Sequence, residues 1–238
     1  MAQPTIIATE STVYAPTADS GSIRAFTGVD IPTAANTVFV MFTNDNPESA
    51  KTISSFVFDN TAIQNTLLHE IDVSSSTLSK VTQVNVYDTR SLGTFSNEDV
   101  TVTLSSGTSG KSLLGVVCTD GFLENFFASD NLFQGVFQLS VFSSNFANNT
   151  LLQMGSLDGN ITSFSYTTGT EVYKTTSSGN ISLVAAKQAT SSSGVKTIAG
   201  TKSADDLSSA TFLISSQPNP LADIDPRGEI ISHDIITN

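Results

Sequence analysis

Apolar and polar residues alternate one at a time along much of this chain. Residues 99–104 read Asp-Val-Thr-Val-Thr-Leu, and serine and threonine together make up 66 of the 238 residues. A period of two places branched apolar side chains on one face of a strand and hydroxyls on the other. The pattern therefore predicts an all-β protein with half-buried strands.

Further apolar runs are separated by turns rich in Gly, Ser, Asn and Asp, which predicts a long series of strands. These strands cover residues 37–43, 53–58, 81–87, 100–104, 112–118, 132–142, 150–154, 161–166, 170–174, 180–187 and 208–216. The first run, Thr-Val-Phe-Val-Met-Phe-Thr, is almost wholly apolar, as is typical of a strand at the centre of a sheet. The series predicts an antiparallel β-sandwich or jelly roll.

Two segments do not follow the alternation. Residues 119–130 place Phe122 and Phe126 four apart, after an Asp120 that can cap a helix, and so predict one short helix. Residues 61–70 fit either a helical turn or a strand with Ile63 inward. We therefore expect one short helix in a fold that is otherwise all β.

Both ends of the chain differ from its middle. Residues 1–36 are rich in Thr, Ala, Pro and Ser, and we expect them to form an N-terminal arm with edge strands. Residues 37–217 form the predicted sandwich, without a composition break. Residues 218–238 are predicted to be a C-terminal arm, because three prolines there interrupt regular structure.

Eight apolar residues are candidates for an assembly interface. Seven of the 15 phenylalanines lie between positions 122 and 146, either in a core helix or in an exposed patch that joins subunits. The isoleucines near the C-terminus either close the chain's own sheet or add a strand to a neighbouring subunit. The candidates are Phe122, Phe126, Phe127, Phe133, Ile230, Ile231, Ile235 and Ile236.

The charge of the chain limits the partners that we expect. Charged residues are 13% of the total, the net charge is −12, and the ten Lys and Arg residues form no cluster. Phosphate backbones and anionic membranes attract clustered cations, so we expect neither nucleic acid nor membrane as a partner. A surface of hydroxyls with few charges suits packing against copies of itself, and it equally suits an ordinary extracellular β-protein.

The N-terminal sequence has no signal-peptide pattern, and no apolar stretch approaches the length of a transmembrane helix. We expect synthesis in a cytosol, and the single cysteine, Cys118, is predicted to be a small buried apolar residue.

Residues typical of catalysis are scarce. His69 and His233 are the only histidines, and neither accompanies a nucleophile motif, so no enzyme and no cofactor are expected. For the carboxylates Asp120, Glu124 and Asp130 we expect capping and solvation. A calcium site there is the alternative, and a glycoside hydrolase with a carboxylate pair is a further one.

The order of elements from residue 37 to residue 122 carries a resemblance. The strand Val-Phe-Val-Met-Phe is followed by Ile-Ser-Ser-Phe-Val-Phe-Asp-Asn-Thr-Ala-Ile (53–63), then Val-Asn-Val-Tyr (84–87), Val-Thr-Val-Thr-Leu (100–104) and Leu-Leu-Gly-Val-Val (113–117). This order resembles β-sandwich and jelly-roll structural proteins from the virions of tailed bacteriophages. The resemblance implies a sandwich fold and carries no catalytic residue.

Together these observations favour a structural protein of a bacteriophage virion, a capsid decoration (cement) protein or a tail or fibre component. It would assemble with itself, as a trimer by analogy, and with other virion proteins, on a virion built in the host cytoplasm. The alternative is a surface adhesin or carbohydrate-binding sandwich. The absence of Trp, with only four Tyr, argues against sugar binding.

Overall fold

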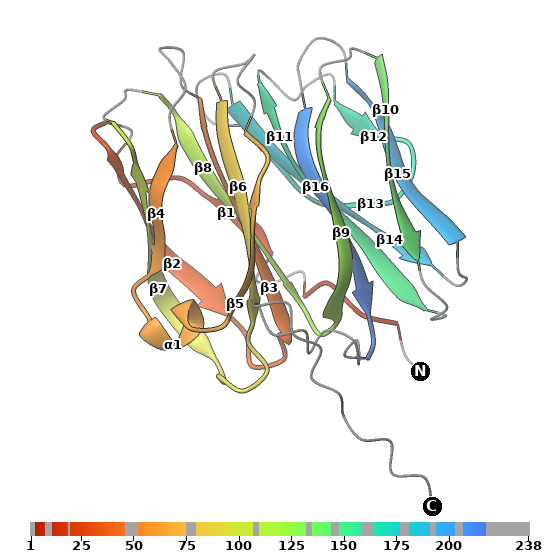
Figure 1. Cartoon of the computed structure of the whole chain (residues 1–238), viewed down its shortest axis with the longest axis horizontal. Helices are drawn as coiled ribbons and strands as arrows, with labels where there is room; N and C mark the ends of the chain where they lie inside the picture. The colour runs from red at the N-terminus through yellow and green to blue at the C-terminus, as the bar shows by residue number, and fades with distance from the viewer. Residues whose placement is uncertain are drawn as a thin grey trace, which may run out of the picture.

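The computed structural model describes residues 3–7, 11–18, 20–45, 52–74, 80–106, 110–131, 135–143, 148–158, 164–176, 181–190, 194–202 and 207–217. In this part of the chain the strands form four antiparallel sheets, accompanied by one short helix. The structure thus confirms an all-β sandwich architecture. It also divides the sandwich region into two halves, each made of one five-stranded and one three-stranded sheet (Figure 1).

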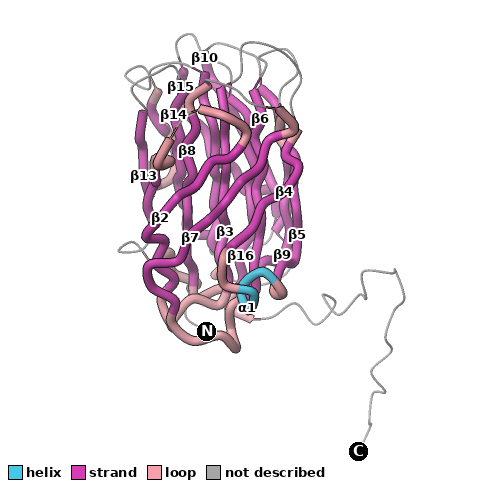
Figure 2. The backbone as a smooth tube through the Cα atoms, turned by 90° about the vertical axis from the view of Figure 1, so that its left-hand side faces the viewer, coloured by secondary structure: helices cyan, strands magenta, loops and turns pink. Residues whose placement is uncertain are grey.

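The first half contains two sheets, which we call sheet A and sheet B. In spatial order, sheet A consists of β1 (Thr12–Tyr14), β8 (Ser112–Thr119), β3 (Thr37–Asp45), β6 (Lys80–Asp88) and β5 (Leu67–Asp72). Sheet B consists of β2 (Ile23–Ile31), β7 (Phe95–Leu104) and β4 (Ile53–Phe58), which face the viewer in Figure 2. One apolar core joins the two sheets.

The second half contains sheets C and D. In spatial order, sheet C consists of β13 (Thr170–Thr176), β14 (Ile181–Thr190), β11 (Asn149–Asp158), β16 (Leu207–Ser215) and β9 (Phe122–Asn131). Sheet D consists of β10 (Gly135–Ser143), β15 (Gly194–Lys202) and β12 (Ser165–Tyr166). Two small apolar clusters, around Phe164 and around Ile198, join the sheets.

The two halves pack against each other through sheets A and C, so the sheets stack in the order B, A, C, D (Figure 1). Strand β3 serves both cores: Phe39 and Met41 face sheet C, whereas Val40 and Phe42 face sheet B. The ring centroids of Phe39 and Phe212 of β16 are 4.6 Å apart across the A–C layer. This double burial explains why the sequence of β3 is apolar on both faces.

Strand β7 shows the opposite case. It belongs to sheet B, and Val100, Val102 and Leu104 are buried against sheet A while Thr101 and Thr103 are only half-buried. The alternation in residues 99–104 therefore predicts this strand and its inner face correctly.

The N-terminal residues 3–7 lie along both halves of the molecule. Ile6 belongs to the A–C core, and the amide and hydroxyl of Thr5 donate to the carboxylate of Asp120 at 2.6 and 2.7 Å. Nearby, the Thr150 hydroxyl of β11 donates to the Pro4 carbonyl at 2.7 Å. Strands β1 and β2 follow, each at the edge of its sheet.

The prediction of a helix over residues 119–130 is wrong, because this segment contains strand β9. Residues four apart share a face in a helix and also in a strand, so the spacing of Phe122 and Phe126 fits both. Asp120 is no N-cap, since its carboxylate accepts from Thr5.

The helix found among the described residues, α1 (Thr61–Gln64), lies in the segment where the sequence fitted either a helical turn or a strand. Asn60 caps it by accepting from the Ala62 amide, and Ile63 is buried. Strand β5 begins three residues after the helix ends. Cys118 of β8 is buried in the A–B core, as predicted.

Candidate interaction surface

The structure places three of the predicted interface residues together on one strand. Phe122, Phe126 and Phe127 all belong to β9, one of the two edge strands of sheet C. The other five lie outside the described residues: Phe133, Ile230, Ile231, Ile235 and Ile236. The position of β9 at a sheet edge is therefore the starting point for the site.

Strand β9 lies beside β5, one of the two edge strands of sheet A. The His69 ring of β5 and the Phe126 ring of β9 are 5.3 Å apart between centroids, inclined at 52°. We call this region the β5–β9 seam and define it by Leu68, His69, Arg90, Phe122, Phe126 and Phe127. It lies at one end of the A–C layer, where the edges of sheets A and C meet.

The register of β9 against β16 determines where its phenylalanines point. Phe126 pairs with Phe212 and Phe127 pairs with Thr211. Directly paired residues of antiparallel strands share a face, and Phe212 belongs to the A–C core. Phe126 therefore points toward sheet A, and Phe127 points to the side of sheet D.

Large apolar side chains at the seam remain exposed. Leu68 is 47% exposed, Phe126 37% and Phe127 49%. Within the described residues, the other exposed large apolar side chains are Ile23, Val57 and Val195, on sheets B and D. Scattered apolar residues are normal on a surface, whereas a group beside an open strand edge indicates a contact site.

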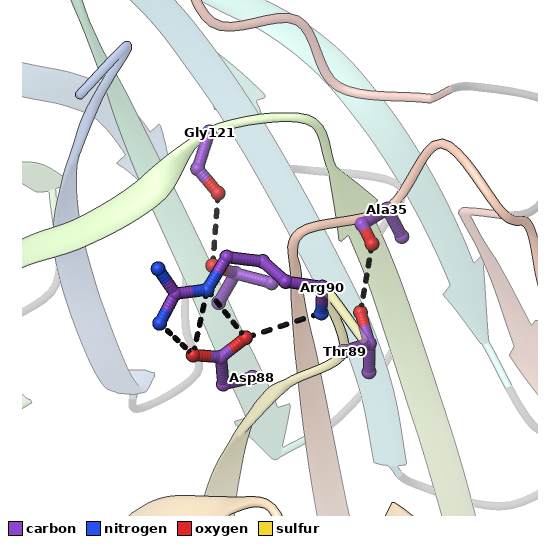
Figure 3. A network of polar contacts seen from close by, with 6 residues as sticks. Ala35, Asp88, Thr89, Arg90 and Gly121 are labelled. Atoms are coloured by element: carbon purple, nitrogen blue, oxygen red, sulfur yellow. Dashed lines mark hydrogen bonds and ion pairs between the residues drawn. The ribbon is translucent and has the colours of Figure 1, made fainter. Parts of the chain in front are cut away.

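A polar network holds one end of the seam (Figure 3). The Arg90 Nε donates to both carboxylate oxygens of Asp88 at 2.9 Å, and its guanidinium lies 5.3 Å from the centroid of the Phe122 ring. The neighbouring Thr89 hydroxyl donates to the Ala35 carbonyl at 2.9 Å. Because the carboxylate fixes the guanidinium over Phe122, this end of β9 is held in place.

His69 is the histidine of the seam. Burial lowers the pKa of His69 below its usual value, which favours the neutral ring against Phe126. The sequence assigned His69 no catalytic role, and the structure places its ring against Phe126. Leu68 and Arg90 were missed, although two adjacent leucines in a strand must place one of them outward.

The carboxylates considered for calcium are engaged in hydrogen bonds. Asp120 accepts from Thr5, and Glu124 accepts from the Asn149 side chain at 2.7 Å. The side chain of Asp130 lies outside the described residues. In the described part of the chain, no three His, Cys, Asp or Glu side chains come together as metal ligands would.

An open pocket of about 480 Å³ lies elsewhere, toward the β13–β14 side of sheet C. Its walls come from the N-terminal residues Gln3 and Thr5 and from β14, which contributes Lys187 and Gln188. The buried Oε1 of Gln188 has no hydrogen-bond partner among the described residues. This pocket can accept a small polar group.

No helix among the described residues combines the length and the apolar character that crossing a bilayer demands. No family model, no curated protein and no solved structure matches the chain.

Proposed function

We propose that the protein is a non-enzymatic structural subunit of a tailed-bacteriophage virion, a capsid decoration protein or a tail or fibre component. The observation that carries the proposal is the β5–β9 seam, where three exposed apolar side chains adjoin two open strand edges. Such a surface suits contact with another protein.

The architecture supports the same proposal. Four stacked sheets with buried interlayers form a solid block, and the N-terminal residues bind both halves together. A subunit of an assembled particle needs a rigid fold and surfaces that bind neighbouring subunits. The resemblance in the order of strands from residue 37 to residue 122 adds the virion context.

The location of the protein can be tested by immunogold electron microscopy. Antibodies raised against the purified protein are applied to virions whose genome encodes it. We expect regular labelling of the capsid or of the tail. Absence of label from intact virions, with label on the host cell surface, would contradict a virion role and favour an adhesin.

The second candidate, a carbohydrate-binding module, rests on the open pocket beside Lys187 and Gln188. Its hydroxyl, amide and ammonium groups can form hydrogen bonds with sugar hydroxyls. Calorimetry with a glycan panel tests this function. Micromolar binding that Gln188→Leu abolishes would support it, and unchanged binding by that variant would exclude this pocket.

A further inference from the structure

The open edges of sheets A and C differ in how they are protected. Edge strands usually carry charges, bulges or very short lengths that prevent a further strand from adding. Strand β5 carries Glu70 and Asp72, and β1 has three residues. Strand β13 carries Glu171 and Lys174 and has a register shift after Glu171.

Strand β9 also carries two charged residues, Glu124 and Asp130, and a register shift between Leu123 and Asn125, but its central part lies between these features. Residues 125–128 read Asn-Phe-Phe-Ala and contain no charge. Phe126 and Phe127 are exposed there on opposite faces of the strand, and no described strand pairs with the outer edge. An incoming strand would thus find backbone partners and an apolar neighbour on each of its two faces.

One segment of this chain has a pattern of apolar residues that matches the β9 edge. Residues 229–236 read Glu-Ile-Ile-Ser-His-Asp-Ile-Ile and lie outside the described residues. In an extended strand, Ile230 and Ile236 share one face while Ile231 and Ile235 share the other. Each face of such a strand therefore carries two isoleucines. On either face they could contact a phenylalanine of β9, because Phe126 and Phe127 lie on opposite faces of that strand.

The linker before this segment is long enough to cross between molecules. Eleven residues, 218–228, separate it from the last described residue, Gln217. Extended, they span up to about 35 Å, and their three prolines favour extension. The chain leaves the fold next to the start of β9, since Ser215 pairs with Phe122.

The chain's own tail is poorly placed to pair with its own β9 edge. The described strands of sheet C pair antiparallel, and an antiparallel partner of β9 begins at that strand's end, whereas the chain leaves the fold at its start. The chain's own linker would have to run the length of the 10-residue β9, about 33 Å, before residues 229–236 could begin to pair. A tail from another molecule approaches the edge from outside. We propose that residues 229–236 of a second copy of this chain add as a strand to the outer edge of β9.

This inference rests on the proposed function only in that the protein acts by assembly. It joins the phenylalanines of β9 and the C-terminal isoleucines as two halves of one contact. One copy donates the strand and its neighbour accepts it, so each copy can do both. Such a head-to-tail contact closes into a ring if the rotation between copies permits.

Complementation between two variants of the full-length chain tests the inference by light scattering. Phe127→Asp removes the acceptor, and Ile231→Asp combined with Ile235→Asp removes the donor. We expect the wild type to form an oligomer and each variant alone to have the mass of one chain, 25.0 kDa. An equimolar mixture should form a dimer of twice that mass, because one intact contact remains.

Matched controls separate this effect from added charge. Ile23→Asp places the same charge at another exposed apolar residue, on edge strand β2, and Ala222→Asp places it in the tail outside 229–236. Both should keep the wild-type mass. Phe127→Ser serves as a second acceptor variant if Phe127→Asp lowers the melting temperature.

The possible results are distinct. Persistence of the oligomer in the donor variant, or failure of the mixture to form a dimer, would overturn the inference. A wild type that stays monomeric at every concentration would overturn it too, while immunogold labelling of virions would still support the proposed function. Conversely, complementation without virion labelling would retain the strand exchange and reject the virion role.

Discussion

The two ends of the A–C layer close in different ways. At one end Tyr173 of β13 extends over β8 and is only 8% exposed. At the other end Phe126 of β9 meets His69 of β5 and remains 37% exposed. Both aromatic side chains come from an outermost strand of sheet C, so the difference lies in what sheet A offers each of them.

Sheet A offers Tyr173 a glycine. A Cβ added to Gly115 would lie 2.3 Å from the Tyr173 hydroxyl oxygen and 2.9 Å from its Cζ. The Tyr173 ring therefore occupies the space that a side chain at position 115 would need. Phe126 instead contacts the ring of His69, which keeps it from packing deeper between sheets A and C. The seam is therefore left open to another molecule.

The largest effect should come from the middle of the layer. Phe212 and Phe126 are direct partners on one face, yet Phe212 is fully buried. Phe212→Ala should lower the free energy of unfolding by about 3–5 kcal/mol, the usual cost of deleting a core phenylalanine. Phe126→Ala should cost about 1 kcal/mol or less. Urea unfolding of both variants measures the contrast, and equal losses would mean that Phe126 is a core residue.

The closed end should be the next most sensitive. Gly115→Ala forces Tyr173 to move and should destabilise the protein by about 1–3 kcal/mol, as overpacking does. Tyr173→Phe removes the hydroxyl, which is buried without a partner among the described residues, so alone it should be nearly neutral.

The double variant of Gly115→Ala and Tyr173→Phe sharpens this prediction. Because the shortest contact involves the hydroxyl oxygen, the two changes together should cost less than the sum of their separate effects. Strictly additive effects in thermal or urea unfolding would show that the ring and the glycine do not contact in solution.

The smallest predicted effect is a dependence of stability on pH through His69, at the open end of the A–C layer. Burial lowers the pKa of His69 in the folded protein, so below about 6.5 the unfolded chain binds a proton that the folded one does not. Stability should therefore fall as pH drops from 7 toward 5.5, and His69→Gln should reduce that dependence. Since His69 is partly exposed, the change is small. Identical pH profiles for wild type and variant would refute this role.

The sequence predicts the fold class well because alternation reports one-sided burial directly. Strand β7 illustrates this, with its valines buried and its threonines half-exposed. The rule that hydroxyls face water fails inside the stack. Thr43 and Ser156 are buried between sheets A and C, and their hydroxyls bond to each other at 2.8 Å. Small hydroxyls can satisfy one another there, so composition does not reveal the second layer.

The seam could be predicted only in part. The phenylalanine cluster marks β9, but the spacing of four residues does not distinguish a helix from an edge strand. The partner strand β5 is distant in sequence, and nothing in residues 67–72 indicates that His69 meets Phe126. Which edge stays open depends on sheet order, and that order becomes visible only in the folded chain.

Hydrogen–deuterium exchange of the full-length protein at increasing concentration tests the central claim most directly. The claim is that the A–C layer is closed at β13 and open at β9, where a second copy docks. Exchange in residues 122–131 should slow as concentration rises, while exchange in residues 170–176 stays constant. Exchange in residues 122–131 that does not change with concentration would contradict the account.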